Sequence, residues 1–359
     1  MSVTTIKPTI EALLRQLVEK GATDLHLSAN RPPCFRLDDR LVPADGGPLS
    51  GAEVKELAYS LLSPEKVERF ERWKELDFAF SIEGLARFRA NFFIQQGYVG
   101  AALRMLPFQI LGFDELGLSA PVLTSLCNKP KGLVLITGST GSGKTTTLAS
   151  MVDFINTNKE YHIITIEDPI EYIHTSKKSI IDQREVGQDT QSFAQGLKHV
   201  LRQDPDLILI GEMRDLETIE TALIVAETGH LVLATLHTSD AVQTVNRIVD
   251  VFPAHQQNQV RIQLSLELLG VISQQLIPKA SGRGRVLAGE ILLVNHAVRS
   301  LIREQKIHQM YSILQTGQKE GMCTMNQSLY NLYMNRVISP EEAVARSSDP
   351  DDLMRLMNR

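Results

Sequence analysis

The sequence predicts an α/β protein in two parts: an α+β N-terminal domain, then a larger domain on a parallel sheet with a helical C-terminal region. Three observations predict it. The 359 residues are enough for two hydrophobic cores. Residues 76–107 alternate apolar and polar side chains, as half-buried strands do. Further along, short continuous apolar runs alternate with helical segments, which is typical of a parallel sheet covered on both faces.

The N-terminal domain is expected to open with an amphipathic helix followed by a small antiparallel sheet. Within residues 5–20, apolar side chains recur at helical spacing, at Ile10, Leu13, Leu14 and Leu17. "DLHLS" and "CFRLDDRLVPAD" then read as short alternating strands, with a turn at Asp38-Asp39.

Two helices and a strand region complete this domain. The stretch 50–73 predicts two helices, each with a good N-terminal signal, Ser50 and Ser63-Pro64. Strand alternation follows over 76–107 with a glycine turn. Periodicity then breaks at Pro107, Gly112, Gly117 and Pro121. We therefore expect a first domain over 1–107, a linker over 108–117 and a second domain over 118–359.

The second domain is expected to hold a buried parallel sheet and then a helical region. The runs "GLVLIT", "HIITI", "LILIG" and "LVLATL" predict the strands. From about residue 240 the pattern is mostly helical, beginning with "QQNQVRIQLSLELLGVISQQLI" and ending with "SPEEAVARS". The helical part is thus predicted to cover about 240–359.

Composition excludes several classes of protein. A net charge of −5 and a pI near 6.0 argue against nucleic acid as the main partner. The three cysteines, Cys34, Cys127 and Cys323, form no C-x-x-C pair, so neither a zinc site nor a disulfide framework is expected, and a reducing cytosol is the natural setting. There is no secretory signal pattern and no run of 18 apolar residues, so direct membrane insertion is not expected.

A phosphate-binding loop stands between the first of these strands and the next helix. Residues 138–145 match G-x-x-x-x-G-K-[ST] completely and occur in the strand–turn–helix context that supports the motif. Backbone N–H groups of such a loop bind phosphate oxygens. Lys144 should reach the β- and γ-phosphates of ATP, and Thr145 should hold Mg²⁺. The predicted nucleotide-binding residues are Gly138, Ser139, Thr140, Gly141, Ser142, Gly143, Lys144, Thr145 and Thr146.

Hydrolysis also needs carboxylates that hold the metal's waters and orient the attacking one. In parallel sheets these belong at the carboxyl ends of strands. Glu212 directly follows an apolar strand and is the candidate for the metal side, where an Asp is commoner in phosphate-loop enzymes. Glu171 is favoured as the water-activating base, with Glu167 as its support. The alternative for each is a solvated acid in a strand-to-helix loop.

Two histidines flank one strand. Seven strand residues span roughly 23 Å, so His230 and His237 cannot both contact one γ-phosphate. His237, at the carboxyl end, is the better sensor of bound nucleotide. His230 is expected to serve a subunit contact or the core.

Arginines on the N-terminal domain are candidates for catalysis in a neighbouring subunit. Arg87 and Arg89 share one face of the strand "ARFRANFF", because side chains alternate along a strand. They suit an arginine finger offered to ATP in an adjacent subunit, and Arg104 on the next strand is expected to join them. The alternative is that these are solvated strand charges.

These segments together resemble the secretion ATPase superfamily, most closely the type IV pilus retraction ATPases (PilT-type). "GSTGSGKTTT" is similar to the family's Walker A, "ITIEDPIEY" to its aspartate box, "LILIGEMRDLET" to its Walker B and "AETGHLVLATLHT" to its histidine box. "GATDLHLS", "ARFRAN" and "LIRE" with "KIHQMYS" match regions on either side, so the resemblance covers nearly the whole chain.

The resemblance implies a PAS-like first domain and a RecA-like ATPase domain with a helical tail, assembled as a homohexamer. It implies ATP between the two domains, arginines from the neighbouring subunit, and an inner-membrane pilus platform protein as partner. The expected location is the cytoplasm, peripheral at the pilus base on the inner membrane. Pilus retraction, with pilin depolymerisation and twitching motility, is the implied function.

Other functions stay open at this stage. Extension and secretion relatives usually carry an extra N-terminal domain and a four-cysteine zinc motif, and this chain has no cysteine pair. Val298 and Ser300 depart from the family's usual "AIRNLIRE", which leaves an accessory, PilU-type retraction ATPase open, with a paralogous retraction ATPase as partner. A RecA-like nucleic-acid motor and a nucleotide-regulated module without turnover are the remaining alternatives.

Overall fold

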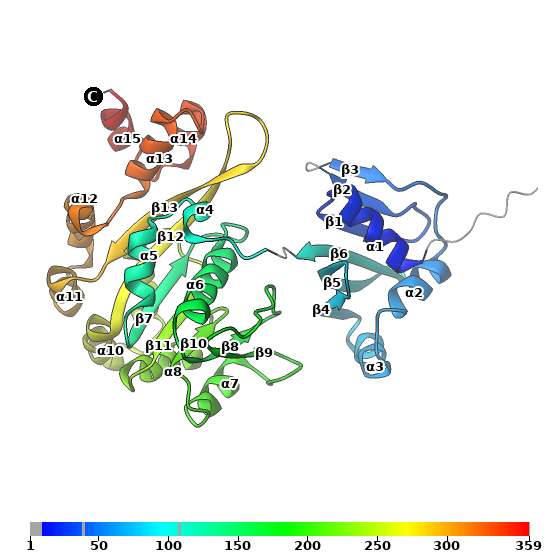
Figure 1. Ribbon diagram of the computed structural model, residues 1–359, viewed down its shortest axis with the longest axis horizontal. Helices are drawn as coiled ribbons and strands as arrows, with labels where there is room; N and C mark the ends of the chain where they lie inside the picture. The colour runs from blue at the N-terminus through cyan, green and yellow to red at the C-terminus, as the bar shows by residue number, and fades with distance from the viewer. Residues whose placement is uncertain (1–8, 38–39, 107–108, 359) are drawn as a thin grey trace, which may run out of the picture. The chain divides into compact units, whose positions relative to one another are not determined.

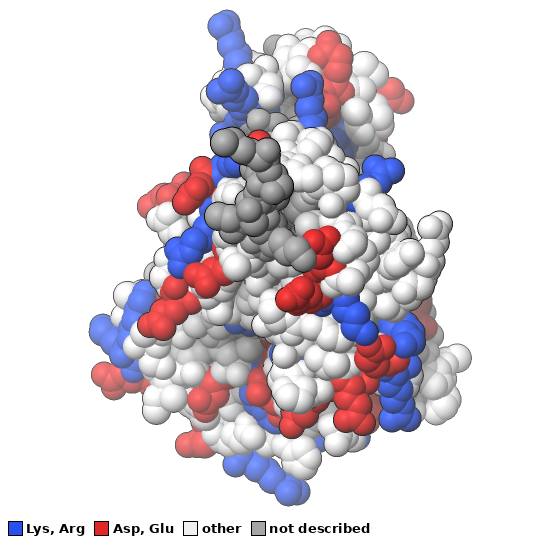
Figure 2. Space-filling model, turned by 90° about the vertical axis from the view of Figure 1, so that its right-hand side faces the viewer, with Lys and Arg blue, Asp and Glu red and all other residues white. Residues whose placement is uncertain are grey.

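The computed structural model describes residues 9–37, 40–106 and 109–358. The chain forms two compact units (Figure 1). The first takes residues up to Gln109 together with the segment Pro169–Ile173, and the second takes Ile110–Asp168 and His174–Arg359. Over the face drawn in Figure 2, Lys and Arg are interspersed with Asp and Glu.

The first unit is a six-stranded antiparallel sheet with three helices, as its alternating pattern predicts. The sheet order is β3-β2-β1-β6-β5-β4. The strands are β1 (Asp24–Leu27), β2 (Cys34–Leu37), β3 (Arg40–Pro43), β4 (Glu75–Ile82), β5 (Ala86–Gln95) and β6 (Tyr98–Leu106). The helices are α1 (Ile10–Glu19), α2 (Gly51–Tyr59) and α3 (Pro64–Trp73).

Local signals in the sequence determine these elements. Ser50 and Ser63 cap α2 and α3 as expected, and the apolar face of α1 is buried. Phe88 and Phe92 on β5 are fully buried with Leu13 and Leu17 of α1 in one core. The predicted turn at Asp38-Asp39 and the break at Pro107 lie outside the described residues.

The second unit is built on a seven-stranded sheet of order β13-β12-β7-β11-β10-β8-β9. Strands β7 (Gly132–Thr137), β8 (His162–Glu167), β9 (Ile180–Glu185), β10 (Leu207–Ile210) and β11 (Leu231–Leu236) run parallel. Helices cover both faces, so successive strand residues enter two different cores. This burial on both sides explains the continuous apolar runs.

The helices of the second unit follow the strands in an α/β pattern and then cluster at the C-terminal end. Before β7 lie α4 (Phe113–Leu116) and α5 (Ala120–Cys127). Between the strands lie α6 (Lys144–Asn158), α7 (Phe193–Val200), α8 (Leu216–Glu227), α9 (Ala241–Asp250) and α10 (Ala254–Glu267). After the sheet come α11 (His296–Arg303), α12 (Met310–Thr316), α13 (Met325–Met334), α14 (Pro340–Arg346) and α15 (Pro350–Met357). Figure 1 shows α13, α14 and α15 beside the β12–β13 hairpin.

The expectation of a mostly helical region from about residue 240 is wrong for two strands. β12 (Leu268–Pro278) begins directly after α10 and pairs parallel to β7, and β13 (Arg285–Leu293) pairs antiparallel to β12. At Leu268 the backbone turns extended, with φ −68° and ψ 124°, and no Gly or Pro marks the change. A strand buried on both faces has the same continuous apolar pattern as a buried helix, so periodicity could not separate them.

The predicted linker over 108–117 also needs correction. Its described part from Ile110 onward groups with the second unit and includes α4. Gly117 ends this helix at φ 80°, a left-handed conformation that glycine adopts at little cost. The glycines that interrupted the periodicity therefore cap a short helix of the second unit.

Candidate nucleotide-binding and hydrolysis site

The phosphate loop connects β7 to α6, as the motif predicts. Its glycines Gly138, Gly141 and Gly143 have φ of 139°, 77° and 92°, where a side chain would be strained. A Cβ at Gly138 would lie 2.4 Å from the carbonyl oxygen of Gln274 on β12, so the loop also needs glycine there for space. The 15-residue helix α6 starts at Lys144 and directs its N-terminal N–H groups at the loop.

Lys144 is folded back over the loop. Its Nζ donates hydrogen bonds to the carbonyl oxygens of Gly138, at 2.8 Å, and Ser139, at 3.0 Å, and the residue is 9% exposed. Thr145 and Thr146 are half-buried in the first turn of α6. Among the described residues, the buried hydroxyl of Ser142 has no hydrogen-bond partner. The loop therefore presents a cation and polar groups of the kind that bind phosphate oxygens.

β12 supports the phosphate loop. The sequence did not predict this support, because the stretch that forms β12 reads as a helix. The hydroxyls of Ser273 and Thr137, the last residue of β7, are 2.8 Å apart. Gln274 is fully buried, and its Nε2 donates to Thr147 Oγ1 at 2.7 Å. The strand thus contacts both the start of the loop and the helix that follows it.

Glu212 follows β10 and is contacted by the side chains of Arg214 and His237. Arg214 approaches it in a two-pronged contact, with Nε 2.7 Å from Oε1 and Nη2 2.8 Å from Oε2, and His237 Nε2 lies 3.0 Å from Oε1. Partial burial alone would raise the pKa of Glu212, but the hydrogen bond from Arg214 and the proximity of His237 outweigh it and lower the pKa below 4.5. Glu212 is therefore a charged carboxylate at neutral pH.

Glu167 is the last residue of β8, the strand next to β10, and it is only 7% exposed. Its Oε1 accepts hydrogen bonds from Thr165 Oγ1 at 2.7 Å and from Gln183 Nε2 at 3.2 Å. Gln183 lies on β9, a strand that the sequence reasoning did not predict. Glu171 is half-buried and belongs to the segment Pro169–Ile173 of the first unit.

The two histidines lie at opposite ends of β11, as expected. His237 follows the strand at its carboxyl end and contacts Glu212. His230 precedes the strand, and its Nδ1 lies 3.0 Å from the carbonyl oxygen of Val225 and 3.2 Å from Thr228 Oγ1. His230 is thus held at the end of α8, within its own unit.

The three arginines lie on the sheet of the first unit. Arg89 on β5 and Arg104 on β6 are directly opposite each other in the register. Arg104 Nε lies 2.7 Å from Asp24 Oδ1, and Arg89 Nη2 lies 3.8 Å from Asp77 Oδ1. Arg87 Nε donates to the carbonyl oxygen of Ile170 at 3.0 Å, within the same unit. Each of the three arginines therefore has a polar partner within the first unit, and the pair of Arg89 with Asp77 is the longest.

A cavity of about 310 Å³ lies beside the phosphate loop in the second unit. Gly143, Thr146 and Thr147 form one side of it. The β12–β13 hairpin and the segment around α4 form the rest, with Leu276, Lys279, Arg285, Val286, Leu287, Leu111, Glu115, Leu116 and Gly117. Its size is at the lower end of the range for small-molecule pockets.

Within the described part of the chain, no helix is both long and apolar enough to span a bilayer. The same residues contain no group of three or more His, Cys, Asp or Glu side chains arranged to hold a metal ion by themselves.

Comparison with known proteins identifies the family. Residues 100–345 match the family described as type II/IV secretion system protein. The type IV pilus retraction ATPase PilT of Pseudomonas aeruginosa is 48% identical over 96% of this chain and 99% of its own length. The type IV pilus ATPase PilU of the same organism is 42% identical over 97% of this chain and 90% of its own length.

A solved structure agrees with these relatives. The crystal structure of the pilus retraction motor PilT with bound ADP superposes with a TM-score of 0.91 at 52% identity, covering 97% of this chain and all of that one. The match includes both units, so the fold class expected from the sequence is confirmed. The chain belongs to the type II/IV secretion system protein family and, within it, to the type IV pilus retraction ATPases.

Proposed function

We propose that this chain is a subunit of a hexameric motor whose hydrolysis of ATP drives type IV pilus retraction, with the residue roles given below. The phosphate loop carries the proposal, because Lys144, the glycine cradle and the N-terminus of α6 together form a site for the phosphates of a nucleotide. An ATPase needs in addition a charged carboxylate and a base near the ends of neighbouring strands. Glu212 follows β10, and Glu167, the proposed support of the base Glu171, ends the neighbouring strand β8.

In this proposal the nucleotide extends from the phosphate loop into the neighbouring cavity. The phosphates contact the loop and Lys144, and the base and ribose lie in the 310 Å³ cavity between Thr146 and Leu287. The loop at Gly143 borders both sites, so one nucleotide can reach both. The apolar side chains of the β12–β13 hairpin offer a surface for the base.

Thr145 and Glu212 are the residues that would hold Mg²⁺, through the hydroxyl and through bound water. Hard oxygen donors suit this ion, and Glu212 keeps its charge because Arg214 and His237 lower its pKa. When bound, Mg²⁺ neutralises charge on the phosphates. His237 is the proposed sensor of bound nucleotide, because its Nε2 lies 3.0 Å from Glu212 Oε1 and its contact can change when that carboxylate binds another group.

Water activation is assigned to Glu171, with Glu167 in support. Glu167 ends β8, and hydrogen bonds from Thr165 and Gln183 orient its carboxylate. Glu171 follows it four residues later, in the segment Pro169–Ile173.

Assembly supplies the remaining parts of the proposal. Arg87, Arg89 and Arg104 are offered to ATP in a neighbouring subunit of the hexamer, with Arg89 having the weakest partner within its own chain. The ring acts at the cytoplasmic face of the inner membrane on the pilus platform protein. His230 serves a subunit contact or the packing at the end of α8.

A second candidate is an accessory retraction ATPase that works with a paralogue. The 42% identity to PilU over nearly the whole chain favours keeping it, although the identity to PilT is higher. The two functions differ in whether the chain retracts pili without another retraction ATPase.

The experiment counts surface pili and measures twitching in a piliated strain that lacks its retraction ATPases, with and without this protein. We expect fewer pili and restored twitching with the parent chain. Lys144→Ala should abolish both effects and lower ATP turnover by at least about 100-fold, because the phosphates lose their cation. If the parent chain turns over ATP no faster than the Lys144→Ala variant, the proposal of an ATP-driven motor is refuted. Normal turnover with no effect on pili would favour the accessory role.

A further inference from the structure

The segment between β8 and β9 leaves the second unit and returns to it. Glu167 ends β8, and His174 is the residue at which the chain re-enters the second unit. Between them, Pro169–Ile173 groups with the first unit and carries Glu171. The position of Glu171 therefore depends on how the two ends of this excursion are held.

Gln183 joins those two ends with one side chain. Its Oε1 accepts the backbone N–H of His174 at 2.8 Å, and its Nε2 donates to Glu167 Oε1 at 3.2 Å. A primary amide can accept and donate at the same time, whereas a carboxylate can only accept. If the amide were flipped, its NH2 group would face the N–H of His174 and its oxygen would face the Glu167 carboxylate. Neither pair could form a hydrogen bond, so the two contacts determine the orientation of the amide.

The strand register explains why Gln183 can reach both groups. β8 and β9 pair in parallel, with Gln183 opposite Thr165 and Glu185 opposite Glu167. Side chains two apart on a strand share a face, so Thr165 and Glu167 lie on the same face of β8. Thr165 and Gln183 both donate to the same oxygen of Glu167, which fixes that carboxylate in one orientation.

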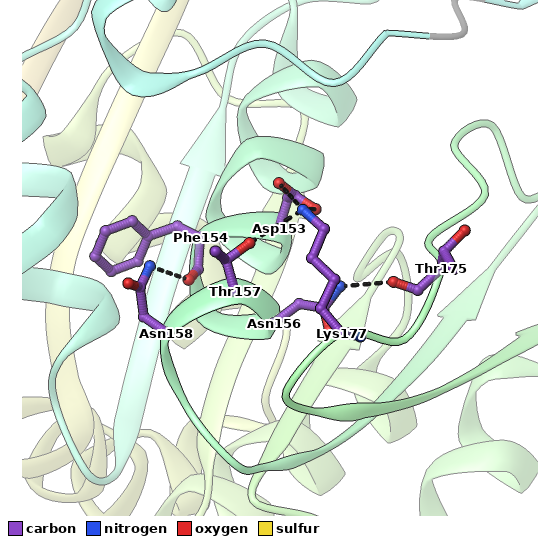
Figure 3. Close-up of polar contacts among 7 residues, drawn as sticks. All are labelled: Asp153, Phe154, Asn156, Thr157, Asn158, Thr175 and Lys177. Atoms are coloured by element: carbon purple, nitrogen blue, oxygen red, sulfur yellow. Dashed lines mark hydrogen bonds and ion pairs between the residues drawn. The ribbon is translucent and has the colours of Figure 1, made fainter.

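The returning part of the chain is fixed separately to α6, the helix that begins at the phosphate loop. Figure 3 shows these contacts. Asn156 is fully buried, and it accepts the N–H of Lys177 and donates to the carbonyl oxygen of Thr175, both at 2.9 Å. Lys177 Nζ lies 2.7 Å from Asp153 Oδ1. With the chain beyond His174 held by α6, the Gln183 contacts set the span between the returning end and Glu167.

We propose that Gln183 is a positioning residue for ATP hydrolysis: it ties Glu167 to the backbone of His174 and thereby holds the loop that presents Glu171 to the attacking water. This rests on the proposed function, in which Glu171 is the base. The two partners of its amide described above, Glu167 and the backbone of His174, both lie outside the phosphate loop. We therefore expect its loss to affect the chemical step more than nucleotide binding.

The test compares Gln183→Ala with Asp182→Ala in the full-length chain. Asp182 is the adjacent β9 residue on the opposite strand face, where it contacts His162 at 3.0 Å, so it controls for damage to the strand. We expect Gln183→Ala to lower kcat about 10- to 100-fold with KM for ATP within about twofold, because a displaced catalytic group costs rate rather than binding. Asp182→Ala should stay within about threefold of the parent.

Gln183→Glu separates positioning from packing by its pH dependence. The carboxylate can still accept the His174 N–H, but it faces Glu167 and cannot donate to it while ionised. Two adjacent carboxylates raise the pKa of one of them, so at low pH a shared proton restores the bond. The ratio of variant to parent kcat should fall as pH rises through that pKa. A ratio that is flat between pH 5 and 8 would contradict the proposal.

Hydrogen exchange gives a readout besides activity. The His174 amide should exchange faster in Gln183→Ala than in the parent, while the Lys177 amide, held by Asn156, should not change. Glu171→Gln, assayed in parallel, keeps the two proposals apart. If Glu171→Gln is inactive and Gln183→Ala retains parent kcat, positioning by Gln183 is refuted alone. If Glu171→Gln retains parent kcat, the base assignment is wrong and this inference fails with it.

Discussion

Two carboxylates of the second unit, Glu212 and Glu290, are both removed from water but differ in their partners. Glu212 follows β10 with its side chain 18% exposed, and Arg214 and His237 contact it. Glu290 lies on β13, is 4% exposed, and accepts the backbone N–H of Ala241 at 2.9 Å. The first is paired with the Arg214 guanidinium and the His237 ring, and the second accepts a hydrogen bond from a neutral backbone amide at the start of α9.

The pKa values follow this difference. The pKa of Glu212 is lowered, because the hydrogen bond from Arg214 and the charge of His237 outweigh burial. Burial raises the pKa of Glu290 to about 7, and the amide from Ala241 offsets only part of that. A carboxylate that serves a metal must stay charged near neutral pH, so the lowered pKa of Glu212 fits the role proposed for it and the raised pKa of Glu290 does not fit such a role.

The largest expected effect comes from removing the charged carboxylate of this pair, Glu212. Glu212→Ala should lower kcat for ATP about 100- to 1,000-fold, because the site loses its charged oxygen donor. Arg214 and His237 are 68% and 41% exposed, so water can solvate them and the fold should lose less than about 1 kcal/mol. Steady-state turnover and thermal unfolding measure the two effects. Turnover within threefold of the parent would remove Glu212 from the site.

The Glu290 side is tested by pH. Because its folded pKa of about 7 lies above the ordinary 4.5, the folded state binds more protons between these values, and the free energy of unfolding falls as pH rises. The contribution of Glu290 is fully present below about pH 4.5 and is lost as pH passes about 7. Glu290→Gln keeps the oxygen that accepts the Ala241 N–H and removes the charge.

Glu290→Gln should therefore raise the free energy of unfolding at pH 8 by roughly 1–3 kcal/mol and change it little at pH 4.5. Denaturant unfolding followed by circular dichroism at the two pH values measures this. An equal gain at both values would show that charge is not the cause. A loss at pH 8 would show that the ionised form of Glu290 stabilises the fold.

The sequence predicted the local parts of this site and missed the parts that depend on neighbouring strands. The phosphate loop is a continuous motif with its strand and helix attached, so Gly138 to Thr145 could be assigned residue by residue. Glu212 could be found because it directly follows an apolar run. Its partner Arg214 is two residues away, yet the contact depends on the backbone turn after β10 and cannot be read from spacing.

Edge and doubly buried strands were the hard cases. β9 reads "IIDQRE" and lies at the sheet edge, and because four of its six residues are polar, neither strand alternation nor a continuous apolar run indicated it. Without β9, Gln183 could not be connected to Glu167. β12 was not predicted for the opposite reason: it is strongly apolar and follows α10 directly, so the two read as one helix. Without β12, its close approach to Gly138 in the phosphate loop and its hydrogen bond to Thr147 in α6 could not be predicted.

The first unit extends the comparison to a third carboxylate, Asp24, which no pattern in the sequence singles out. Its side chain is 8% exposed, and Arg104, eighty residues away on β6, contacts it at 2.7 Å. Burial alone would raise the pKa of Asp24, but hydrogen bonds from Thr23 and Arg104 outweigh burial and lower it. Asp24 thus resembles Glu212 in having a cationic partner, although it lies outside the nucleotide site.

Arg104→Ala should destabilise the first unit by about 1–2 kcal/mol at pH 7, because a buried carboxylate loses one of its charged donors. Arg89→Ala is the matched comparison, since its pair with Asp77 is longer, at 3.8 Å, and exposed, and we expect at most about 0.5 kcal/mol. Trp73, the single tryptophan of the chain, lies in this unit and reports its unfolding by fluorescence.

The pH dependence of the Arg104 effect decides whether the ion pair is its cause. Because the folded pKa of Asp24 is lowered, its contribution is present above the ordinary 3.8 and is lost as pH falls through the folded value. The gap between parent and Arg104→Ala should therefore close in acid. A gap that persists there would assign the loss to packing of the arginine stem along the sheet, and Asp24 would then be held mainly by Thr23, whose hydroxyl lies 2.7 Å from it.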